Sequence, residues 1–299
     1  MNAIEVHNIS KSFGKVRALD DVSFSVAGGE LFGLIGPDGA GKTTLFRLLA
    51  TLIPPSGGTA TVAGFDIVEN YLDIRSRVGY MPGRFSLYQD LTVEENLAFF
   101  AALFGVRVED SYDLIAPVYR QIEPFRTRRA GKLSGGMKQK LALSCALIHC
   151  PSVLLLDEPT TGVDAVSRSE FWDMLAGLKQ KGITVLVSTP YMDEASRCDR
   201  IALCNEGRIL GIDTPERIVE TFDAPLYAVR ADDMYALLAA ARAAAGVREC
   251  YPFGDTHHLV ADKDFDCRSF EKSLKGVDGL RIEPVKPTVE DVFIKLMKR

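Results

Sequence analysis

The chain has 299 residues, 47% of them hydrophobic and 25% charged, which is enough for one large domain with a smaller second one. Its formal net charge of −5 argues against a broad nucleic-acid-binding face, so we expect no nucleic acid partner. No apolar run approaches the roughly 18 residues of a membrane span, and the first residues do not resemble a signal peptide. We therefore expect a cytoplasmic protein whose six cysteines are buried free thiols.

Short apolar runs alternate with helical patterns along residues 1–222, which we predict to form one domain. Strands are predicted at 4–7, 22–26, 31–35 and 59–62, and helices at 42–51 and 94–104, the latter with Thr92 as N-cap. The region of about 84–150 contains no continuous apolar strand and is predicted to be a helical subdomain. The apolar runs 153–157 and 183–188 flank a helix at 166–181, as in a β-α-β unit of a parallel sheet, and a strand at 200–204 leads into a hairpin turn.

The pattern changes after residue 222. Strands are predicted at 226–230, 247–252, 257–261 and 280–284, and helices at 233–244 and 268–274, with a last helix after a capping pattern at 288–291. The order β-α-β-β-α-β is that of a ferredoxin-like unit. We therefore predict an α/β fold in which residues 223–299 form a small α+β ferredoxin-like C-terminal domain.

The segment 36–43 reads Gly-Pro-Asp-Gly-Ala-Gly-Lys-Thr and directly follows the apolar run 31–35, with the spacing of a P-loop. Its glycines let several backbone N–H groups turn toward a phosphate chain, and the following helix adds the positive end of its dipole. Lys42 is a cation for the outer phosphates, and the Thr43 hydroxyl is a ligand for Mg²⁺. The sequence predicts a nucleoside triphosphate site at Gly36, Pro37, Asp38, Gly39, Ala40, Gly41, Lys42, Thr43 and Thr44.

Two further motifs carry chemistry. Asp157 and Glu158 end the apolar run 153–156, where Asp157 would hold Mg²⁺ and Glu158 would polarise the attacking water. Ser134, Gly135 and Gly136 begin an apolar helix and form a second anion site, although a simple capped helix would look the same. Because one nucleotide does not need two phosphate cradles, we expect the second cradle to serve the nucleotide of another subunit.

Together these motifs resemble the ATP-binding cassette (ABC) ATPases that drive membrane transporters. The resemblance covers about residues 1–215 and includes the signature 133–136 and a D-loop-like segment, 159–164, that ends at Asp164. Phe13 matches the aromatic residue that stacks on adenine in such proteins. The resemblance implies a P-loop NTPase with a RecA-like core, an antiparallel β subdomain and a helical subdomain. It also implies that two cassettes sandwich two ATP molecules, each P-loop facing the other chain's signature, so that Phe13, Ser134, Gly135, Gly136 and Asp164 join the ATP site.

The C-terminal unit resembles the extension found on cassette subunits of prokaryotic exporters. The resemblance thus implies a nucleotide-binding subunit that hydrolyses ATP, with Mg²⁺, to drive export through a separate membrane permease. Such a subunit is peripheral to the cytoplasmic face of the membrane, with a second cassette as its other partner. The sequence does not indicate what is transported.

Two positions depart from the family pattern. Gly83 stands where the family has the Q-loop glutamine, and Pro190 stands where it has the switch histidine. Glycine has no side chain, and proline has neither a side-chain donor nor a backbone N–H. Loss of one preorganised donor commonly slows a reaction by about 10²–10³. We therefore expect weakened hydrolysis at a site that keeps Glu158, and a heterodimer with a different cassette.

Two other functions stay open. The chain would be a nucleotide-binding regulatory subunit if its hydrolysis is vestigial. It would be a soluble cassette acting on ribosomes or DNA if the basic stretch 126–129 binds phosphates, although a solvated face explains this stretch more simply. Residues 84–88 mix aromatic side chains with one cation and are a candidate docking surface for a permease.

Overall fold

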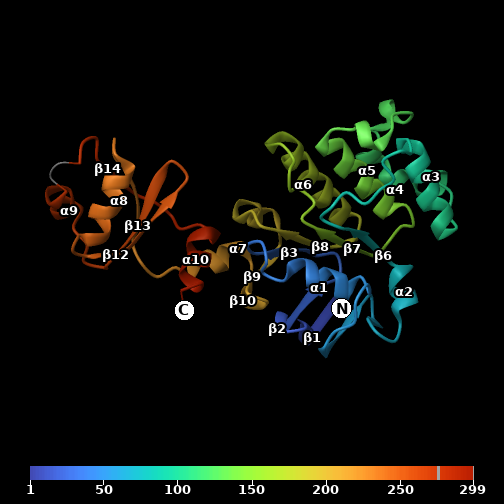
Figure 1. Cartoon of the computed structure of the whole chain (residues 1–299), viewed down its shortest axis with the longest axis horizontal. Helices are drawn as coiled ribbons and strands as arrows, with labels where there is room; N and C mark the ends of the chain where they lie inside the picture. Colours follow the sequence, from blue (N-terminus) through green and yellow to red (C-terminus); the bar gives the residue numbers. More distant parts are fainter. Residues whose placement is uncertain (275–276, 299) are drawn as a thin grey trace. The chain divides into compact units, whose positions relative to one another are not determined.

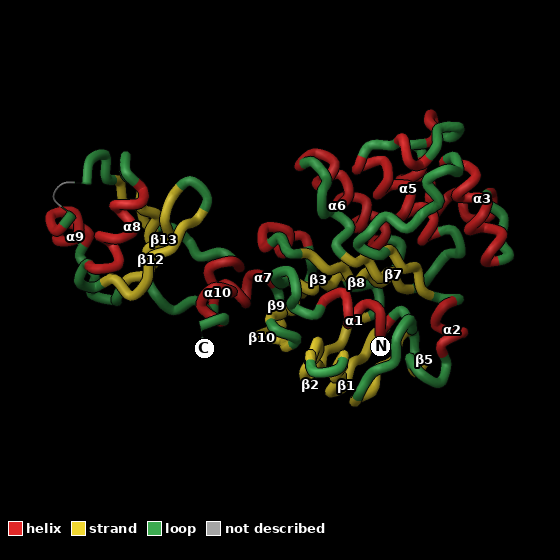
Figure 2. Tube along the Cα trace, in the orientation of Figure 1, coloured by secondary structure: helices red, strands yellow, loops and turns green. Residues whose placement is uncertain are grey.

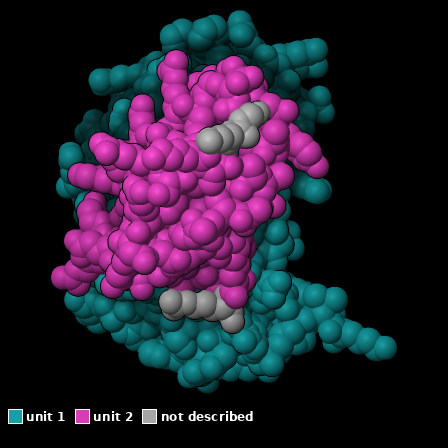
Figure 3. Space-filling model, turned by 90° about the vertical axis from the view of Figure 1, so that its left-hand side faces the viewer, with its two compact units in different colours: residues 1–215 teal, residues 216–299 magenta. Residues whose placement is uncertain are grey.

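The computed structural model describes residues 1–274 and 277–298. Its contacts divide the chain into two compact units, Met1–Pro215 and Glu216–Arg299, which Figure 3 colours separately. This division falls after the first residue of helix α7 (Pro215–Glu220), whereas the sequence analysis drew the boundary after residue 222. Figure 1 follows the chain from one end to the other, and Figure 2 shows its helices and strands.

The centre of unit 1 is a six-stranded sheet with the order β10-β9-β3-β8-β7-β6. All neighbouring pairs are parallel except β9 and β10, which form a hairpin. Every residue of the apolar strands β3, β7 and β8 is buried. Since parallel strands end at one edge of a sheet, the segments that follow β3, β6, β7 and β8 meet there. The strands are β3 (Leu31–Ile35), β6 (Val78–Met81), β7 (Val153–Asp157), β8 (Thr184–Thr189), β9 (Arg200–Asn205) and β10 (Arg208–Asp213).

A second, antiparallel sheet has the order β2-β1-β4-β5 and comprises β1 (Asn2–Phe13), β2 (Val16–Ala27), β4 (Gly57–Val62) and β5 (Phe65–Asp66). Helix α1 (Lys42–Leu49) packs between the two sheets, as Figure 1 shows. Leu45, Phe46, Leu48 and Leu49 of α1 are at most 2% exposed and belong to one core with residues of both sheets. The P-loop helix is therefore fixed on two sides.

The remaining helices of unit 1 are α2 (Tyr71–Arg75), α3 (Val93–Phe104), α4 (Tyr112–Tyr119), α5 (Gly135–Leu147) and α6 (Ala165–Gln180), with short 3₁₀ turns between them. Thr92 and Glu95 form a capping box at the start of α3, and Gly105 ends that helix in the left-handed conformation. Figure 1 shows α3, α4 and α5 gathered in one helical layer. Among the described residues, no helix combines the length and apolar character needed to cross a membrane.

Unit 2 contains a four-stranded antiparallel sheet with the order β12-β13-β11-β14. Its elements follow the predicted order β-α-β-β-α-β and end in an additional helix. They are β11 (Leu226–Arg230), α8 (Met234–Ala243), β12 (Val247–Phe253), β13 (Thr256–Ala261), α9 (Cys267–Ser273), β14 (Arg281–Pro284) and α10 (Val289–Leu296). The two helices inside this order share a core with the sheet, because Leu237, Ala241 and Phe270 pack with Val229 and Leu259.

A buried polar cluster also lies in unit 2. The Asp291 carboxylate accepts hydrogen bonds from the Tyr251 hydroxyl (2.8 Å) and from Thr288, and it lies 2.6 Å from Nδ1 of His258. Burial alone would raise the pKa of Asp291, but the hydrogen bonds from His258, Thr288 and Tyr251 outweigh it and lower that pKa. The folded unit therefore favours the ionised carboxylate.

Other features also differ from the sequence analysis, among them one strand and the burial of two cysteines. Strand β6 was not predicted, because it is only four residues long and contains Gly79. That glycine is required by packing, since a Cβ there would lie 2.3 Å from the Ala146 carbonyl oxygen in α5. The prediction that all six cysteines are buried is also wrong, because Cys150 is exposed at a turn and Cys267 is half-buried.

Candidate functional site

The P-loop connects the buried strand β3 to helix α1. Gly39 and Gly41 have φ angles of 82° and 95°, a conformation that side chains disfavour. Gly36 has no room for a side chain, since a Cβ would lie 2.1 Å from the Cys204 carbonyl oxygen. Ala40 is buried, Pro37 and Thr44 are half-buried, and Asp38 and Gly39 are exposed at the tip.

The end of the P-loop is braced from behind by two other segments. A Cβ on Gly41 would lie 2.6 Å from the carbonyl oxygen of Ala18 in β2, and a Cβ on Gly207 would lie 2.7 Å from the same oxygen. The Gly207 amide, in the β9–β10 turn, donates a hydrogen bond of 3.1 Å to the Ala40 carbonyl. Three backbone segments therefore meet at one point beneath the loop.

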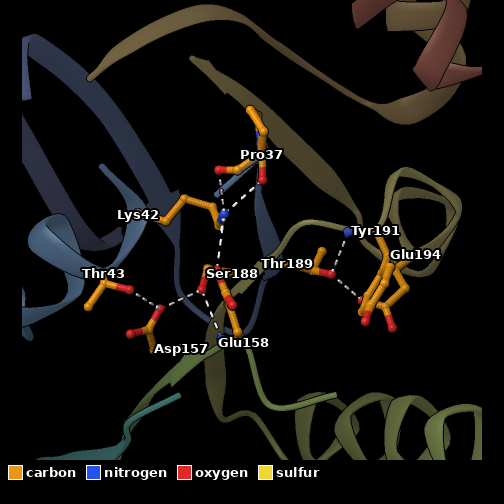
Figure 4. A network of polar contacts seen from close by, with 10 residues as sticks. Pro37, Lys42, Thr43, Asp157, Glu158, Ser188, Thr189, Tyr191 and Glu194 are labelled. Carbon is orange, nitrogen blue, oxygen red and sulfur yellow. Dashed lines mark hydrogen bonds and ion pairs between the residues drawn. The ribbon is translucent and has the colours of Figure 1, made fainter. Parts of the chain in front are cut away.

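The Lys42 side chain, 2% exposed, is folded back into the loop (Figure 4). Its ammonium donates to the carbonyl oxygens of Gly36 (2.7 Å) and Pro37 (2.9 Å) and forms an ion pair of 3.1 Å with Oε1 of Glu158. The three hydrogens of the ammonium thus have three acceptors. The lysine predicted to bind phosphate and the acid predicted to activate water are in direct contact.

Asp157, the last residue of β7, also contacts Thr43 in the first turn of α1. The Thr43 hydroxyl lies 3.2 Å from Oδ1 of Asp157, and the Ser188 hydroxyl donates to the same oxygen at 2.8 Å. Ser188 also accepts the backbone N–H of Glu158, at 2.9 Å from its hydroxyl oxygen. Glu158 has φ 49°, unusual for a residue with a side chain and typical of positions held by their surroundings. Ser188 therefore fixes both carboxylate residues, as Figure 4 shows.

A cavity of about 690 Å³ opens beside these groups, lined by Thr43, Arg47, Leu52, Tyr80, Pro82, Gly83, Arg84, Asp157 and Glu158. Burial, and to a lesser degree the Asp157 charge, raises the pKa of the Tyr80 hydroxyl to about 12, so it stays protonated at neutral pH. The predicted metal ligands and the predicted catalytic acid thus face one polar space.

The two departures from the family pattern lie at this edge of the sheet. A Cβ on Gly83 would lie 3.1 Å from the carbonyl oxygen and 3.8 Å from Oδ2 of Asp157, so position 83 adjoins the carboxylate but offers it no side chain. Pro190 follows β8 and is half-buried. The Thr189 hydroxyl, the last one on β8, accepts the Tyr191 N–H and donates to Glu194.

Ser134 caps helix α5 and accepts the Met137 N–H at 3.3 Å, while Ser134 and Gly135 are exposed. Gly136 is buried, and it has no room for a side chain, since a Cβ there would lie 2.8 Å from Oγ of Ser167 in α6. The helix start 134–136 therefore keeps its exposed groups available while its back packs on α6.

Asp164 and Phe13 lie elsewhere in unit 1. Asp164 is exposed and caps α6, where the hydrogen bond from the Ser167 N–H lowers the pKa of its carboxyl. Phe13 ends β1, with its side chain 50% exposed and the Lys11 ammonium 5.2 Å from the ring centre. The contacts described above bring Lys42, Thr43, Asp157 and Glu158 together, and they do not link Phe13, Ser134 or Asp164 to that group.

Sequence reasoning missed two residues of this region, Ser188 and Glu194. Both are buried polar residues, and both bond to segments far away in the sequence. Ser188 follows the apolar residues 185–187 near the end of a buried strand, which is the signal that could have revealed it. Glu194 lies in a short polar turn and carries no such signal.

Comparisons with known proteins identify the family of this chain. The family model for ABC transporters matches residues 19–161. The chain is 43% identical over 215 residues to the probable multidrug ABC transporter ATP-binding protein YbhF of Escherichia coli K12, a match that covers 71% of this chain and 37% of that protein. It is 34% identical over 307 residues to the Nod factor export ATP-binding protein I of Burkholderia lata, covering 99% of this chain and 97% of that one. A solved ATP-binding subunit of an ABC transporter is 30% identical with a TM-score of 0.67, covering 74% of this chain and 93% of that one. The chain therefore belongs to the family of ABC transporter ATP-binding proteins.

Proposed function

We propose that the chain is the nucleotide-binding subunit of an ABC exporter, which binds and hydrolyses ATP to drive transport through a separate membrane permease. The observation that carries this proposal is the convergence of Lys42, Thr43, Asp157 and Glu158 at one sheet edge. The names of the relatives support export, because one is a probable multidrug ABC transporter protein and the other a Nod factor export protein. The subunit would act at the cytoplasmic face of the membrane, as a peripheral protein.

The P-loop would hold the triphosphate. The backbone N–H groups of 36–44, apart from Pro37, would surround the phosphates, and the Lys42 ammonium would exchange its carbonyl and Glu158 partners for phosphate oxygens. Phe13 would stack on the adenine, since its side chain is 50% exposed.

The Thr43 and Asp157 oxygens, 3.2 Å apart, fit a Mg²⁺ site, because this ion takes one or two protein ligands and completes its shell with phosphate oxygens and water. When bound, Mg²⁺ would neutralise phosphate charge. Ser188 would keep the Asp157 carboxylate oriented by donating to it at 2.8 Å.

Glu158 would accept the proton of the attacking water, but at a slow rate. Neither Gly83 nor Pro190 offers a side-chain donor at the phosphate end of the site, and the Thr189 hydroxyl already donates to Glu194. One missing transition-state donor costs about 10²–10³ in rate. The site would therefore bind ATP well and turn it over poorly.

The partner would be a second, different cassette. The exposed Ser134 and Gly135 at the start of α5 would face the nucleotide of that cassette, with Asp164 nearby in the closed pair. A heterodimer is favoured because a homodimer would lack the glutamine and the histidine in both sites.

A groove of about 680 Å³ supports a permease docking site. It is lined by β6, residues 84–87 of the predicted docking segment, side chains of α5, and apolar side chains of α3, among them Phe100, Leu103 and Phe104. Its charged lining residues are Arg75, which donates to Thr51, and Arg84, which makes no ion pair or hydrogen bond within the described residues. We assign to this groove an amphipathic cytoplasmic segment of the permease that carries an acidic residue. Arg84→Glu should release the subunit from permease-containing membranes, whereas the exposed control Lys263→Glu should not, and equal binding by both variants would contradict the docking site.

The alternative is a regulatory subunit with vestigial hydrolysis, and one pair of variants separates the two functions. If hydrolysis at this site drives transport, Glu158→Gln and Lys42→Ala both abolish transport by the assembled exporter. If only binding matters, transport survives Glu158→Gln and is lost in Lys42→Ala. Rapid ATP turnover by the isolated chain would contradict the proposed weakening, and absence of ATP binding would overturn the whole proposal.

A further inference from the structure

Glu194 is a buried carboxylate outside the group described above, 3% exposed, in the turn after β8. Its Oε2 accepts hydrogen bonds from the hydroxyls of Thr189 (2.5 Å) and Thr160 (3.2 Å), and both threonines are also buried. Figure 4 shows the side of this cluster formed by Thr189, Tyr191 and Glu194. One carboxylate oxygen thus joins the end of β8 to the segment after Glu158.

The opposite oxygen of Glu194 is almost unpaired. Oε1 lies 3.9 Å from Nε of Arg168 in α6, and both atoms are buried without a hydrogen-bond partner within the described residues. The Arg168 guanidinium is held over the Tyr191 ring, 4.6 Å from its centre. The long ion pair with Arg168, 3.9 Å, offsets only part of the cost of burying the Glu194 carboxylate, which argues that its two hydroxyl contacts serve a purpose beyond stability.

Thr160 belongs to the segment 159–164, called here the 159–164 loop. The loop is built from turns, with Thr161 N–H bonded to Glu158 O at 3.2 Å and Val163 N–H to Thr160 O at 3.3 Å. Its far side abuts the helix start 134–136, because a Cβ on Gly135 would lie 3.3 Å from the Gly162 carbonyl oxygen. Pro159 and Thr160 are buried, whereas Thr161, Gly162 and Asp164 are exposed. Thr160 thus anchors the buried start of the loop through its side chain.

We propose that Glu194 is a positioning residue, which holds the 159–164 loop against β8 through Thr160 and thereby sets the place of the helix start 134–136. The proposal rests on the proposed function, in which that helix start faces the nucleotide of a second cassette. Pro190 offers no side-chain donor, and the Thr189–Glu194–Thr160 bridge is a polar side-chain link between the end of β8 and the loop.

The test is amide hydrogen exchange, read by mass spectrometry, of the full chain with and without ATP and Mg²⁺. Thr160→Val removes the hydroxyl and keeps the shape of the side chain. Thr161→Val is the matched control, because it makes the same change one residue later on an exposed side chain. Thr160→Ser restores the hydroxyl, and Glu194→Ala removes the bridge from its other end.

Thr160→Val should speed exchange of the amides at 161–168 and 135–138 by at least about tenfold, as expected when a local restraint of one buried hydrogen bond is lost. The exchange rates of the β7 amides and the affinity for ATP should stay within about twofold of wild type, and Thr160→Ser should restore slow exchange.

Equal exchange in Thr160→Val and Thr161→Val would overturn the proposal. The proposal would also be overturned if the exchange rates of Thr160→Val rose equally throughout the chain and its melting temperature fell, since Thr160 would then have a merely structural role. Wild-type chain that fails to bind ATP would instead overturn the proposed function, so the two failures are distinguishable.

Discussion

Replacing Glu158 by glutamine should tighten ATP binding while it removes turnover. In the structure, the Glu158 carboxylate occupies one of the three donors of the Lys42 ammonium at 3.1 Å, and that pair must break before Lys42 reaches phosphate. Two unit charges at this distance attract by about 5 kcal/mol at an effective dielectric constant of about 20. Most of this attraction is offset by the cost of desolvating both groups, which leaves a net of about 1–2 kcal/mol.

A net of this size corresponds to a dissociation constant about 5–30-fold lower for Glu158→Gln. Isothermal titration calorimetry with ATP and Mg²⁺ measures it directly, and a phosphate-release assay should show turnover lower by about 10²–10⁴ because a general base is lost. Glu170→Gln is the matched control: it makes the same substitution at an exposed acid that pairs with Lys140 on α5, and it should leave the affinity unchanged. An affinity of Glu158→Gln equal to or weaker than that of wild type would refute the reasoning.

Three further predictions concern stability and acid sensitivity. Gly36→Ala should lower the free energy of unfolding by at least about 2 kcal/mol, because its Cβ would overlap the Cys204 carbonyl oxygen at 2.1 Å. Chemical denaturation measures this free energy, and a variant as stable as wild type would contradict the close approach. Thr92→Ala should cost about 1 kcal/mol in the same assay through loss of the capping box, with Thr92→Ser close to wild type. The Asp291 carboxylate, whose pKa is lowered next to His258, contributes stability that is complete above its unfolded pKa of about 4 and is lost as the pH falls through the lower folded pKa. Calorimetry between pH 2.5 and 7 should therefore show a smaller acid-side loss of stability for Asp291→Asn than for wild type, and equal slopes would argue against the lowered pKa.

The sequence predicted those elements whose cause is local. Continuous apolar runs identified β3 and β7 with their observed bounds, and Thr92 and Thr288 form the capping boxes expected from their spacing. The P-loop pattern and the strand-end acids likewise predicted groups that the fold brings into contact, because strand order alone determines that they share an edge.

The rest depends on contacts between distant segments. Strand β6 exists because β7 pairs with it and α5 crosses it at Gly79, and four residues alone carry too weak a pattern. Ser188 and Glu194 each bond to a residue more than 30 positions back along the chain, so local spacing could not reveal these two bonds. The exposure of Cys150 depends on a turn with φ 52°, which apolar periodicity does not reveal.

The point where Gly41, Ala18 and Gly207 meet has a consequence for how the chain can vary. Residue 207 is far from the P-loop in sequence and holds no ligand group, yet a methyl group there would push on the same oxygen that confines Gly41. A substitution in the β9–β10 turn should therefore displace the backbone of the P-loop near Gly41. Selection for nucleotide binding would then act on this turn as well as on the P-loop.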